Sequence, residues 1–288
     1  MLLAFDDELE RAERLAAAAA LPLARIARHR FPDGELKLTL PVQLPPRTVL
    51  LRTLAQPNEK LVELLLAAHT ARELGAQHLT LVAPYLAYMR QDVAFAPGEA
   101  VSQRIVGAFL AGLFDRVITV DPHLHRIDDL RAAIPIAEAI ALSAAPAIGA
   151  FLRSRCAGAL LLGPDQEAEQ WVRAAAAAGG FDWACARKTR HGDRDVAIEL
   201  PALNLRGRAV VLLDDMASTG TTLARAARQL LGAGAARVDV AVTHGLFVGD
   251  ALAALRAAGV SQVWSADTVA HPTNAIAVLP LLAQALAQ

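Results

Sequence analysis

The chain of 288 residues is long enough for two domains of ordinary size or for one large domain. Its 28 basic and 29 acidic residues nearly cancel, which leaves no surplus positive charge to follow a nucleic-acid backbone. Two cysteines without metal-ligand spacing, the acidic DDELE near the start and the lack of an apolar run of about 18 residues predict a cytoplasmic protein that binds neither nucleic acid nor membrane.

Short apolar runs alternate along the chain with longer segments rich in alanine and leucine. Runs of strand length lie at 48–54, 78–85, 116–121, 158–163, 209–215, 237–244 and 262–267. Segments with helical spacing lie at 58–74, 100–112, 165–178, 219–233 and 249–258. Strands that are apolar along their whole length and separated by helices are typical of parallel sheets covered on both faces. We therefore expect an α/β fold.

The remaining stretches connect these elements. IPIAEAIALSAAPAIGAFLRSRCA at 134–157 predicts a connection and a helix between two α/β halves. Two polar stretches, 86–99 and 186–197, predict loops, where binding residues concentrate. Ligands of open α/β sheets bind beyond the carboxyl ends of the strands. Chemistry is therefore expected at the polar residues that end the predicted strands: Tyr85, Asp121, Asp165, Asp215 and His244.

The stretch VVLLDDMASTGTTLARAARQLL at 210–231 predicts a buried strand, a short turn and a helix. The start of a helix presents unpaired backbone N–H groups at the positive end of its dipole, and this favours an anion such as a phosphate. Gly220 lets the backbone approach the anion closely. Hydroxyl donors flank it at Ser218, Thr219, Thr221 and Thr222.

Two carboxylates, Asp214 and Asp215, precede this turn and suit sugar hydroxyls or a magnesium ion. A plain strand followed by a capped helix would explain the hydroxyls, since serine and threonine are good N-caps. It does not explain two adjacent charges at the end of a buried strand, because burying them unpaired is costly. The stretch therefore predicts a sugar-phosphate site.

DDMASTGTT (214–222) resembles the ribose 5-phosphate-binding signature of type I phosphoribosyltransferases and of ribose-phosphate pyrophosphokinases. The rest of the chain resembles the second family, in segments that follow its order: HRFPDGELKL (29–38), PYLAYMRQD (84–92), RVITVDPHLH (116–125), LLGPDQEAEQW (161–171), RKTRHGD (187–193), THGLF (243–247) and DTVAHPTN (267–274). Phosphoribosyltransferases have no counterpart of the N-terminal half. KTR at 188–190 and Ser218 resemble archaeal-type members. The chain departs from the usual pattern at Thr221, where a second glycine is common, and at Gln166 and Glu167, where small residues are common.

The resemblance implies a role for each matching residue. The implied catalytic pair is Lys188 and Arg190, and the implied magnesium (Mg2+) ligands are His123 and Asp165. ATP binding is implied for Phe31, Asp33, Glu35, Arg90, Gln91 and Asp92. Ribose 5-phosphate binding is implied for Asp214, Asp215, Ser218, Thr219, Gly220, Thr221 and Thr222. Taken alone, the same residues have plainer interpretations: a solvated loop at 186–197, a turn or core histidine at His123, a helix cap at Asp165 and a simple turn in FPDG.

The resemblance also implies the architecture. It predicts two pseudo-symmetric phosphoribosyltransferase-like domains, each a mostly parallel sheet flanked by helices. The N-terminal domain, 1–142, would carry the ATP segments and the oligomer contacts; the C-terminal domain, 143–276, would carry the ribose 5-phosphate and catalytic loops. A helix in 277–288 would pack back on the first domain. In this family the FPDG segment serves a neighbouring subunit. The resemblance therefore implies a homo-oligomer built from dimers, for which a hexamer is one size.

The implied reaction is ATP-dependent diphosphoryl transfer to O1 of ribose 5-phosphate, forming 5-phosphoribosyl 1-pyrophosphate and AMP. VAFAPGEAVSQ at 93–103 contains no basic residue, although common bacterial members have arginines and lysines there. We therefore expect activity that does not depend on free phosphate. The alternatives are a non-catalytic regulatory protein associated with a synthetase, and a phosphoribosyltransferase that consumes the product.

Overall fold

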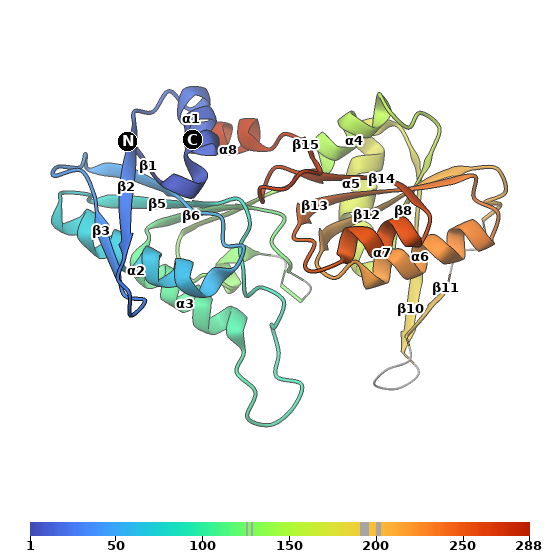
Figure 1. Cartoon of the computed structure of the whole chain (residues 1–288), viewed down its shortest axis with the longest axis horizontal. Coiled ribbons are helices and arrows are strands. Elements are labelled where there is room, and N and C mark those ends of the chain that lie inside the picture. The colour runs from blue at the N-terminus through green and yellow to red at the C-terminus, as the bar shows by residue number, and fades with distance from the viewer. Residues whose placement is uncertain (125, 128, 191–195, 200–202) are drawn as a thin grey trace. The chain divides into compact units, whose positions relative to one another are not determined.

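The protein is described by a computed structural model that covers residues 1–124, 126, 127, 129–190, 196–199 and 203–288, with the backbone alone for 188–190 and 196–199. It divides into two compact units (Figure 1). The first unit is Met1–Leu142 together with Leu279–Gln288, and the second unit is Ser143–Val278.

The first unit is built on a sheet in the order β3-β2-β1-β4-β5-β6-β7. Its strands are β1 Leu2–Phe5, β2 Leu23–Arg30, β3 Leu36–Thr39, β4 Arg47–Leu51, β5 His78–Ala83, β6 Arg116–Val120 and β7 Glu138–Leu142. Neighbouring strands run parallel except β2 and β3, which form an antiparallel hairpin. Its helices are α1 Leu9–Ala18, α2 Pro57–Glu73, α3 Ser102–Leu113 and α8 Leu279–Leu286, with short 3-10 turns η1 Asp6–Glu8 and η2 Leu130–Ala132.

The second unit is built on a parallel sheet in the order β15-β14-β13-β12-β8-β9. Its strands are β8 Leu160–Gly163, β9 Asp182–Cys185, β12 Ala209–Ala217, β13 Arg237–Gly245, β14 Val260–Ala266 and β15 Asn274–Ile276. A separate antiparallel hairpin pairs β10 Arg187–Arg190 with β11 Val196–Glu199. The helices are α4 Ala145–Arg153, α5 Glu169–Gly179, α6 Thr221–Gly232 and α7 Ala251–Ala257, with a 3-10 turn η3 Gln166–Ala168.

The two units repeat one topology. The order β2-β1-β4-β5-β6-β7 in the first sheet corresponds, strand by strand along the chain, to β9-β8-β12-β13-β14-β15 in the second. A 3-10 turn and a helix follow the first strand of each unit, η1 and α1 after β1, η3 and α5 after β8. The connection from β12 to α6 in the second unit is therefore equivalent to that from β4 to α2 in the first.

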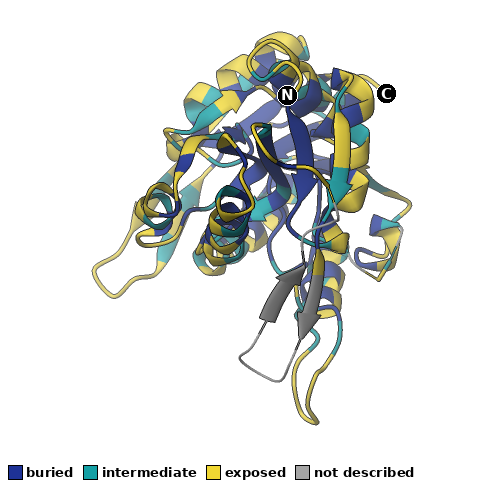
Figure 2. Cartoon of the chain, turned by 90° about the vertical axis from the view of Figure 1, so that its right-hand side faces the viewer, coloured by how far each residue is buried: buried dark blue, intermediate teal, exposed yellow. Residues whose placement is uncertain are grey.

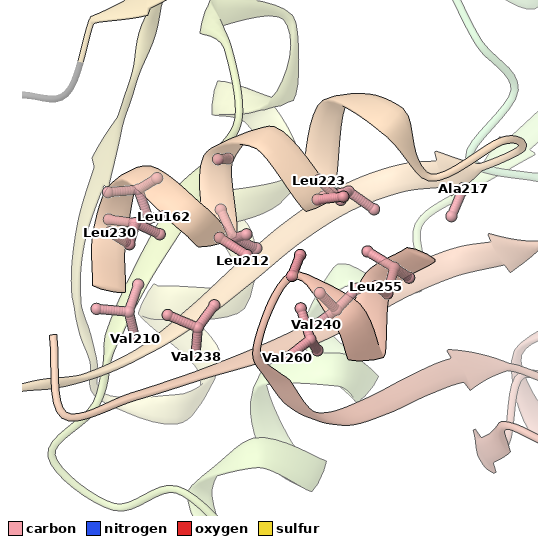
Figure 3. Packing of buried hydrophobic residues seen from close by; sticks show 14 of the residues in the cluster. Leu162, Val210, Leu212, Ala217, Leu223, Leu230, Val238, Val240, Leu255 and Val260 are labelled. Carbon is pink, nitrogen blue, oxygen red and sulfur yellow. The ribbon is translucent and has the colours of Figure 1, made fainter. Parts of the chain in front are cut away.

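The core of the second unit explains its continuous apolar strands. Leu162, Leu212 and Val240 point from one face of the sheet toward α6 and α7, where they meet Leu230 and Leu255 (Figure 3). Residues in the alternate positions are also buried, among them Leu161, Val211 and Leu213. Helices α4 and α5 contact this second face. Strands covered on both faces need apolar residues at every position. Figure 2 shows the strands of the sheet buried and the outward sides of the helices exposed.

The C-terminal helix α8 belongs to the first unit, where it packs against α1 and β6. The buried Arg116 at the start of β6 donates from Nη2 to the carbonyl oxygen of Ala285, at 2.8 Å. Within the described residues, no helix combines the length and the apolar character needed to cross a membrane.

The predicted α/β class is confirmed, and each predicted strand and helix has a counterpart in the structure. Two expectations for connecting stretches need correction. The segment 134–157 contains the strand β7 before its helix, and 186–197 contains strand β10 and the start of β11 rather than a loop alone. Neither strand has the sequence of a buried strand: β7 is a half-exposed edge strand whose alanine-containing sequence EAIAL also suits a helix, and β10 reads RKTR.

Candidate functional site

The predicted phosphate turn lies between β12 and α6. Strand β12 extends to Ala217, so Asp214 and Asp215 lie inside it rather than at its end, and α6 begins at Thr221. Gly220 precedes the helix with φ of 70°, a left-handed conformation in which a glycine avoids the strain of a side chain. The helix N-terminus, with its unpaired N–H groups, therefore opens at the carboxyl edge of the sheet.

The hydroxyl groups of the turn remain accessible. Thr219 and Thr221 are exposed, and their Oγ1 atoms lie 3.0 Å apart in a hydrogen bond. Ser218 and Thr222 are half-buried. All the turn residues implied by the resemblance thus lie within one short connection, which is what a small anion needs.

The loop after β13 holds the turn from one side. The backbone N–H groups of Leu246 and Phe247 both donate to the carbonyl oxygen of Ala217, at 3.0 Å. That of Val248 donates to the carbonyl oxygen of Ser218, also at 3.0 Å. These bonds fix the carbonyl side of the turn and so its geometry.

The paired aspartates face a crowded acidic environment. Asp215 is buried and Asp214 is half-buried, and the N–H of Asp215 donates to Asp214 Oδ1 at 3.0 Å. Burial, together with the negative charges of Asp215 and Asp165, raises the pKa of Asp214 well above its usual range. A cation or a donor-rich ligand would relieve this repulsion.

Asp165 follows β8 and caps the turn η3, since its Oδ1 accepts from the N–H of Glu167 at 3.0 Å. The plainer interpretation of this residue as a cap is therefore correct, and its negative charge also contributes to the raised pKa of Asp214 on β12. One side chain thus serves the local turn and the acidic edge of the sheet.

Cys185 marks a third strand end at the same edge. Burial raises the pKa of its thiol to about 11, with smaller contributions from the carboxylates of Glu169, Asp165 and Asp214. Gly163 makes room for it, because a Cβ there would lie 2.8 Å from the Cys185 sulfur. The carboxyl ends of β8, β9 and β12 therefore share one acidic patch beside the phosphate turn.

In the first unit, the implied adenine-binding residues lie on the turn of the β2–β3 hairpin. Phe31, Asp33 and Glu35 are all exposed. Asp33 Oδ1 accepts from the N–H of Glu35 at 3.1 Å, and Gly34 has φ of 96°, so FPDG does form a tight turn. A pocket of about 470 Å³ lies between this hairpin and α2, lined by Arg30, Gly34, Glu35, Leu36, Glu59 and Val62.

The segment Arg90–Asp92 combines one exposed residue with two that are held inside the unit. Arg90 is exposed, and Gln91 Oε1 accepts from the hydroxyl of Ser102 at 2.9 Å. Asp92 is 7% exposed and pairs with Arg126 Nη1 at 2.6 Å. Sequence reasoning did not single out Arg126, although a basic residue soon after the strand-end His123 was an available signal.

The remaining predicted site residues are described only in part. His123 is half-buried and follows β6 in the first unit. The backbone of Lys188 and Arg190 lies on β10, and their side chains lie outside the described residues. Among the residues that are described, no group of three or more His, Cys, Asp or Glu side chains is placed to hold a metal ion.

A strand–turn–helix with hydroxyls after two carboxylates, at the carboxyl edge of a parallel sheet, defines an α/β protein of the phosphoribosyltransferase type. Comparison with known proteins agrees. Residues 159–270 match the phosphoribosyl transferase domain, and residues 1–113 match the N-terminal domain of ribose phosphate pyrophosphokinase.

Relatives match along the full length. The chain is 35% identical to a ribose-phosphate pyrophosphokinase of Methanopyrus kandleri, over 99% of this chain and 98% of that protein. It is 34% identical to one of Halobacterium salinarum, over 99% and 100%. The crystal structure of phosphoribosylpyrophosphate synthetase from Mycobacterium smegmatis shares the fold, with a TM-score of 0.84 at 24% identity over 99% and 97% of the two chains. The chain therefore belongs to the ribose-phosphate pyrophosphokinase family of enzymes.

Proposed function

We propose that the chain transfers the diphosphoryl group of ATP to O1 of ribose 5-phosphate, giving 5-phosphoribosyl 1-pyrophosphate and AMP. The observation that carries this proposal is the hydroxyl-rich turn at the start of α6, directly after Asp214 and Asp215. A phosphate site beside two carboxylates suits a ligand with a phosphate at one end and hydroxyls at the other. The relatives named for this activity support the same reaction.

The turn would bind the 5-phosphate. Backbone N–H groups at the start of α6 and the hydroxyls of Thr219 and Thr221 supply donors, and the helix dipole favours the negative charge. Gly220 keeps the approach open, since it carries no side chain. Ser218 and Thr222 would complete the set of donors.

Asp214 and Asp215 would accept hydrogen bonds from the ribose hydroxyls. Hydrogen bonds to charged groups contribute about 1.5–3 kcal/mol each, more than neutral ones. Burial and the neighbouring carboxylates raise the pKa of Asp214, and the repulsion between these carboxylates would fall as the donors arrive. This arrangement would hold the sugar by its hydroxyls and its phosphate together and so orient O1 for transfer.

Magnesium fits the donor set at this edge. Mg2+ prefers oxygen ligands, and it usually binds one or two carboxylates while waters and substrate phosphates complete its shell. The negative charges of Asp215 and Asp165 beside Asp214 are of the kind that a divalent cation neutralises. We propose Asp165 as its protein contact in the second unit; His123, which the resemblance implies as a magnesium ligand, belongs to the first unit. When bound, the ion would neutralise charge on the phosphates of ATP.

The other implied residues would act on ATP. Lys188 and Arg190 would stabilise charge on the transferring group, since little covalent work is left to the protein in phosphoryl transfer. Arg90 would contact the phosphates, and Gln91 and Asp92 the nucleoside. The exposed hairpin residues Phe31, Asp33 and Glu35 would serve the adenine of an adjacent subunit in a homo-oligomer built from dimers.

The test is AMP release from ATP and ribose 5-phosphate with magnesium and no added phosphate. Wild type should form AMP, and Lys188→Ala should lose about 100-fold or more in kcat, because a cation acting on transition-state charge is removed. Arg173→Ala, an exposed arginine on α5, is the matched control and should leave the rate unchanged. A wild type that releases no AMP at any phosphate concentration would overturn the proposal and favour the regulatory protein.

A further inference from the structure

We propose that the ring contact between Phe247 and His271 positions the ribose 5-phosphate turn, although neither residue belongs to that turn. This inference rests on the proposed function. It adds a pair of positioning residues to it, in the loops that follow β13 and β14.

Phe247 and its neighbours are linked to the turn by backbone hydrogen bonds. Its own N–H and that of Leu246 converge on the carbonyl oxygen of Ala217, and the next N–H, of Val248, bonds to that of Ser218. The path of 246–248 therefore decides where these two carbonyl groups point. Peptide planes are rigid, so a rotation of these carbonyls also moves the N–H groups that follow in the turn.

Phe247 has an unusual backbone conformation. Its φ is 35°, a left-handed value that a bulky residue rarely adopts and that persists only where the surroundings hold it. The side chain is 8% exposed. A Cβ on Gly245 would lie 2.6 Å from Phe247 Cε2 and 2.9 Å from the Cβ of Ser265, so the ring lies directly against the backbone there. Side-chain packing therefore holds this backbone in place.

His271 also packs against the ring of Phe247. The centroids of Phe247 and His271 lie 4.8 Å apart at 43°, within the range of a favourable aromatic pair. His271 is itself anchored: its Nδ1 accepts from the N–H of Thr273 at 3.2 Å and lies 2.8 Å from Thr273 Oγ1. The N–H of His271 donates to Asn274 Oδ1 at 2.9 Å.

The loop that carries His271 is hydrogen-bonded to strand β14. Asn274 Nδ2 donates to Ser265 Oγ at 2.9 Å and to the carbonyl oxygen of Ala266 at 3.0 Å, both on β14. Thr273 Oγ1 and Ser265 Oγ lie 2.7 Å apart. Nδ1 of His271 accepts a backbone N–H, and burial lowers the pKa of this imidazole, which favours its neutral form. These hydrogen bonds fix His271 to the end of β14.

These contacts form one continuous path. It runs from β14 through His271 to Phe247, and from the loop 246–248 to the carbonyl groups of Ala217 and Ser218. Removing the ring contact frees Phe247 to leave its left-handed conformation. The turn then loses the alignment of its phosphate donors. Binding of ribose 5-phosphate should weaken, while ATP binding and turnover at saturation should change little.

The experiment separates the ring contact from the hydrogen bonds of His271. In His271→Asn the amide oxygen takes over the acceptor role of Nδ1 while the ring is lost. In His271→Phe the ring remains while the acceptor is lost. The dissociation constant of ribose 5-phosphate is measured by calorimetry, together with kcat and the KM of both substrates.

We expect Phe247→Leu and His271→Asn to raise the KM and Kd of ribose 5-phosphate about five- to tenfold, with kcat and the KM of ATP within about twofold. The double variant should be no worse than either single variant, because both remove one contact. His271→Phe should stay close to wild type. The matched control is Phe151→Leu, which breaks another aromatic contact to β14, with Trp264 at 5.6 Å, and has no link to the turn. Its ribose 5-phosphate KM should not change.

The outcomes are distinguishable. A wild-type chain that neither binds ribose 5-phosphate nor releases AMP defeats the proposed function itself. An active wild type with an unchanged ribose 5-phosphate KM in His271→Asn, or the same loss in Phe151→Leu, overturns the positioning role. If Phe247→Leu does not fold, the half-exposed His271 still carries the test through its two variants.

Discussion

Gln56 in the first unit and Gly220 in the second unit occupy equivalent positions: each is the left-handed residue before the helix that follows a central strand, with φ of 54° and 70°. The repeated topology thus extends to the backbone of this connection. In the first unit, Pro57 follows the left-handed residue and occupies the first helical position, where it has no N–H to offer. In the second unit Thr221 follows, with an N–H and a hydroxyl. Only the second version suits a phosphate.

Gly220→Ala should weaken both folding and ribose 5-phosphate binding. The left-handed conformation costs a residue with a Cβ about 1–2 kcal/mol, and the added Cβ would lie 3.4 Å from the Ala251 carbonyl oxygen. Urea unfolding and calorimetric binding of ribose 5-phosphate measure the two effects. Gly232→Ala at the other end of α6, where a Cβ meets open space, should instead stabilise by about 0.5–1 kcal/mol. Equal binding by Gly220→Ala and wild type would argue against a phosphate at this turn.

Arg52→Ala should be strongly destabilising. The guanidinium is 1% exposed and bonds Asp7 at 2.8 Å, Glu8 at 3.1 Å and Glu63 at 2.5 Å, over the ring of Phe5. Removing it leaves the buried Glu8 and Glu63 with only Arg11 and Arg28, respectively, as cationic partners, and we expect a loss of about 3–5 kcal/mol. Arg25→Ala, which breaks the exposed pair with Asp6, should cost less than about 1 kcal/mol. A similar loss for both variants in chemical denaturation would contradict a buried ion cluster.

Arg126→Ala tests whether Asp92 acts on ATP directly or through its ion pair. The substitution leaves Asp92 buried and unpaired, so we expect a loss of about 1–3 kcal/mol in stability and a higher KM for ATP. Asp92→Asn removes the charge and keeps the shape, and it should be milder. The exposed pair of Arg131 with Asp129 supplies the control, Arg131→Ala. An unchanged KM for ATP in Arg126→Ala would limit the pair to a structural role.

Cys185 should react slowly with thiol reagents at neutral pH. Its pKa is raised from 9.0 to about 11, so at pH 8 the thiolate fraction is about 100-fold below that of an ordinary cysteine. In a Cys156→Ser background, the rate of iodoacetamide labelling should keep rising until pH nears 11. The same shift affects stability. Because the folded state holds this proton more tightly than the unfolded chain, its contribution is full below pH 9 and is lost as pH rises toward 11. A labelling rate that levels off near pH 9 would contradict the raised pKa.

Free phosphate should not activate the enzyme. The segment 93–103 offers no basic side chain to an anionic effector. A titration of phosphate at fixed ATP, ribose 5-phosphate and magnesium should leave the initial rate flat, and ADP should inhibit only in competition with ATP. Sodium sulfate at equal ionic strength controls for salt. Activation by phosphate of several fold, absent with sulfate, would refute this expectation.

How far the sequence predicted the structure depended on the kind of element. Buried strands such as β12 and β13 were found because helices cover both faces and every position is apolar. Strands without such a run escaped notice: β7 is half-exposed, and β3 and β10 each contain charged residues. The central strand β1 was missed as well, because its buried run is only four residues long. Their strand character comes from hydrogen bonds to a partner far away or across a turn, and no local pattern reveals such a partner.

The sequence by itself determined the α/β class, the family and the turn Ser218–Thr222, because apolar periodicity and a phosphate-binding turn are local properties of the chain. Only the tertiary structure decided that the charge of Asp165 acts on Asp214, that Arg126 pairs with Asp92, and that His271 packs on Phe247. Each of these contacts joins residues that are distant in sequence. They depend on strand order and on the loops at the carboxyl ends of the strands, and those follow from packing of the whole unit rather than from any short stretch.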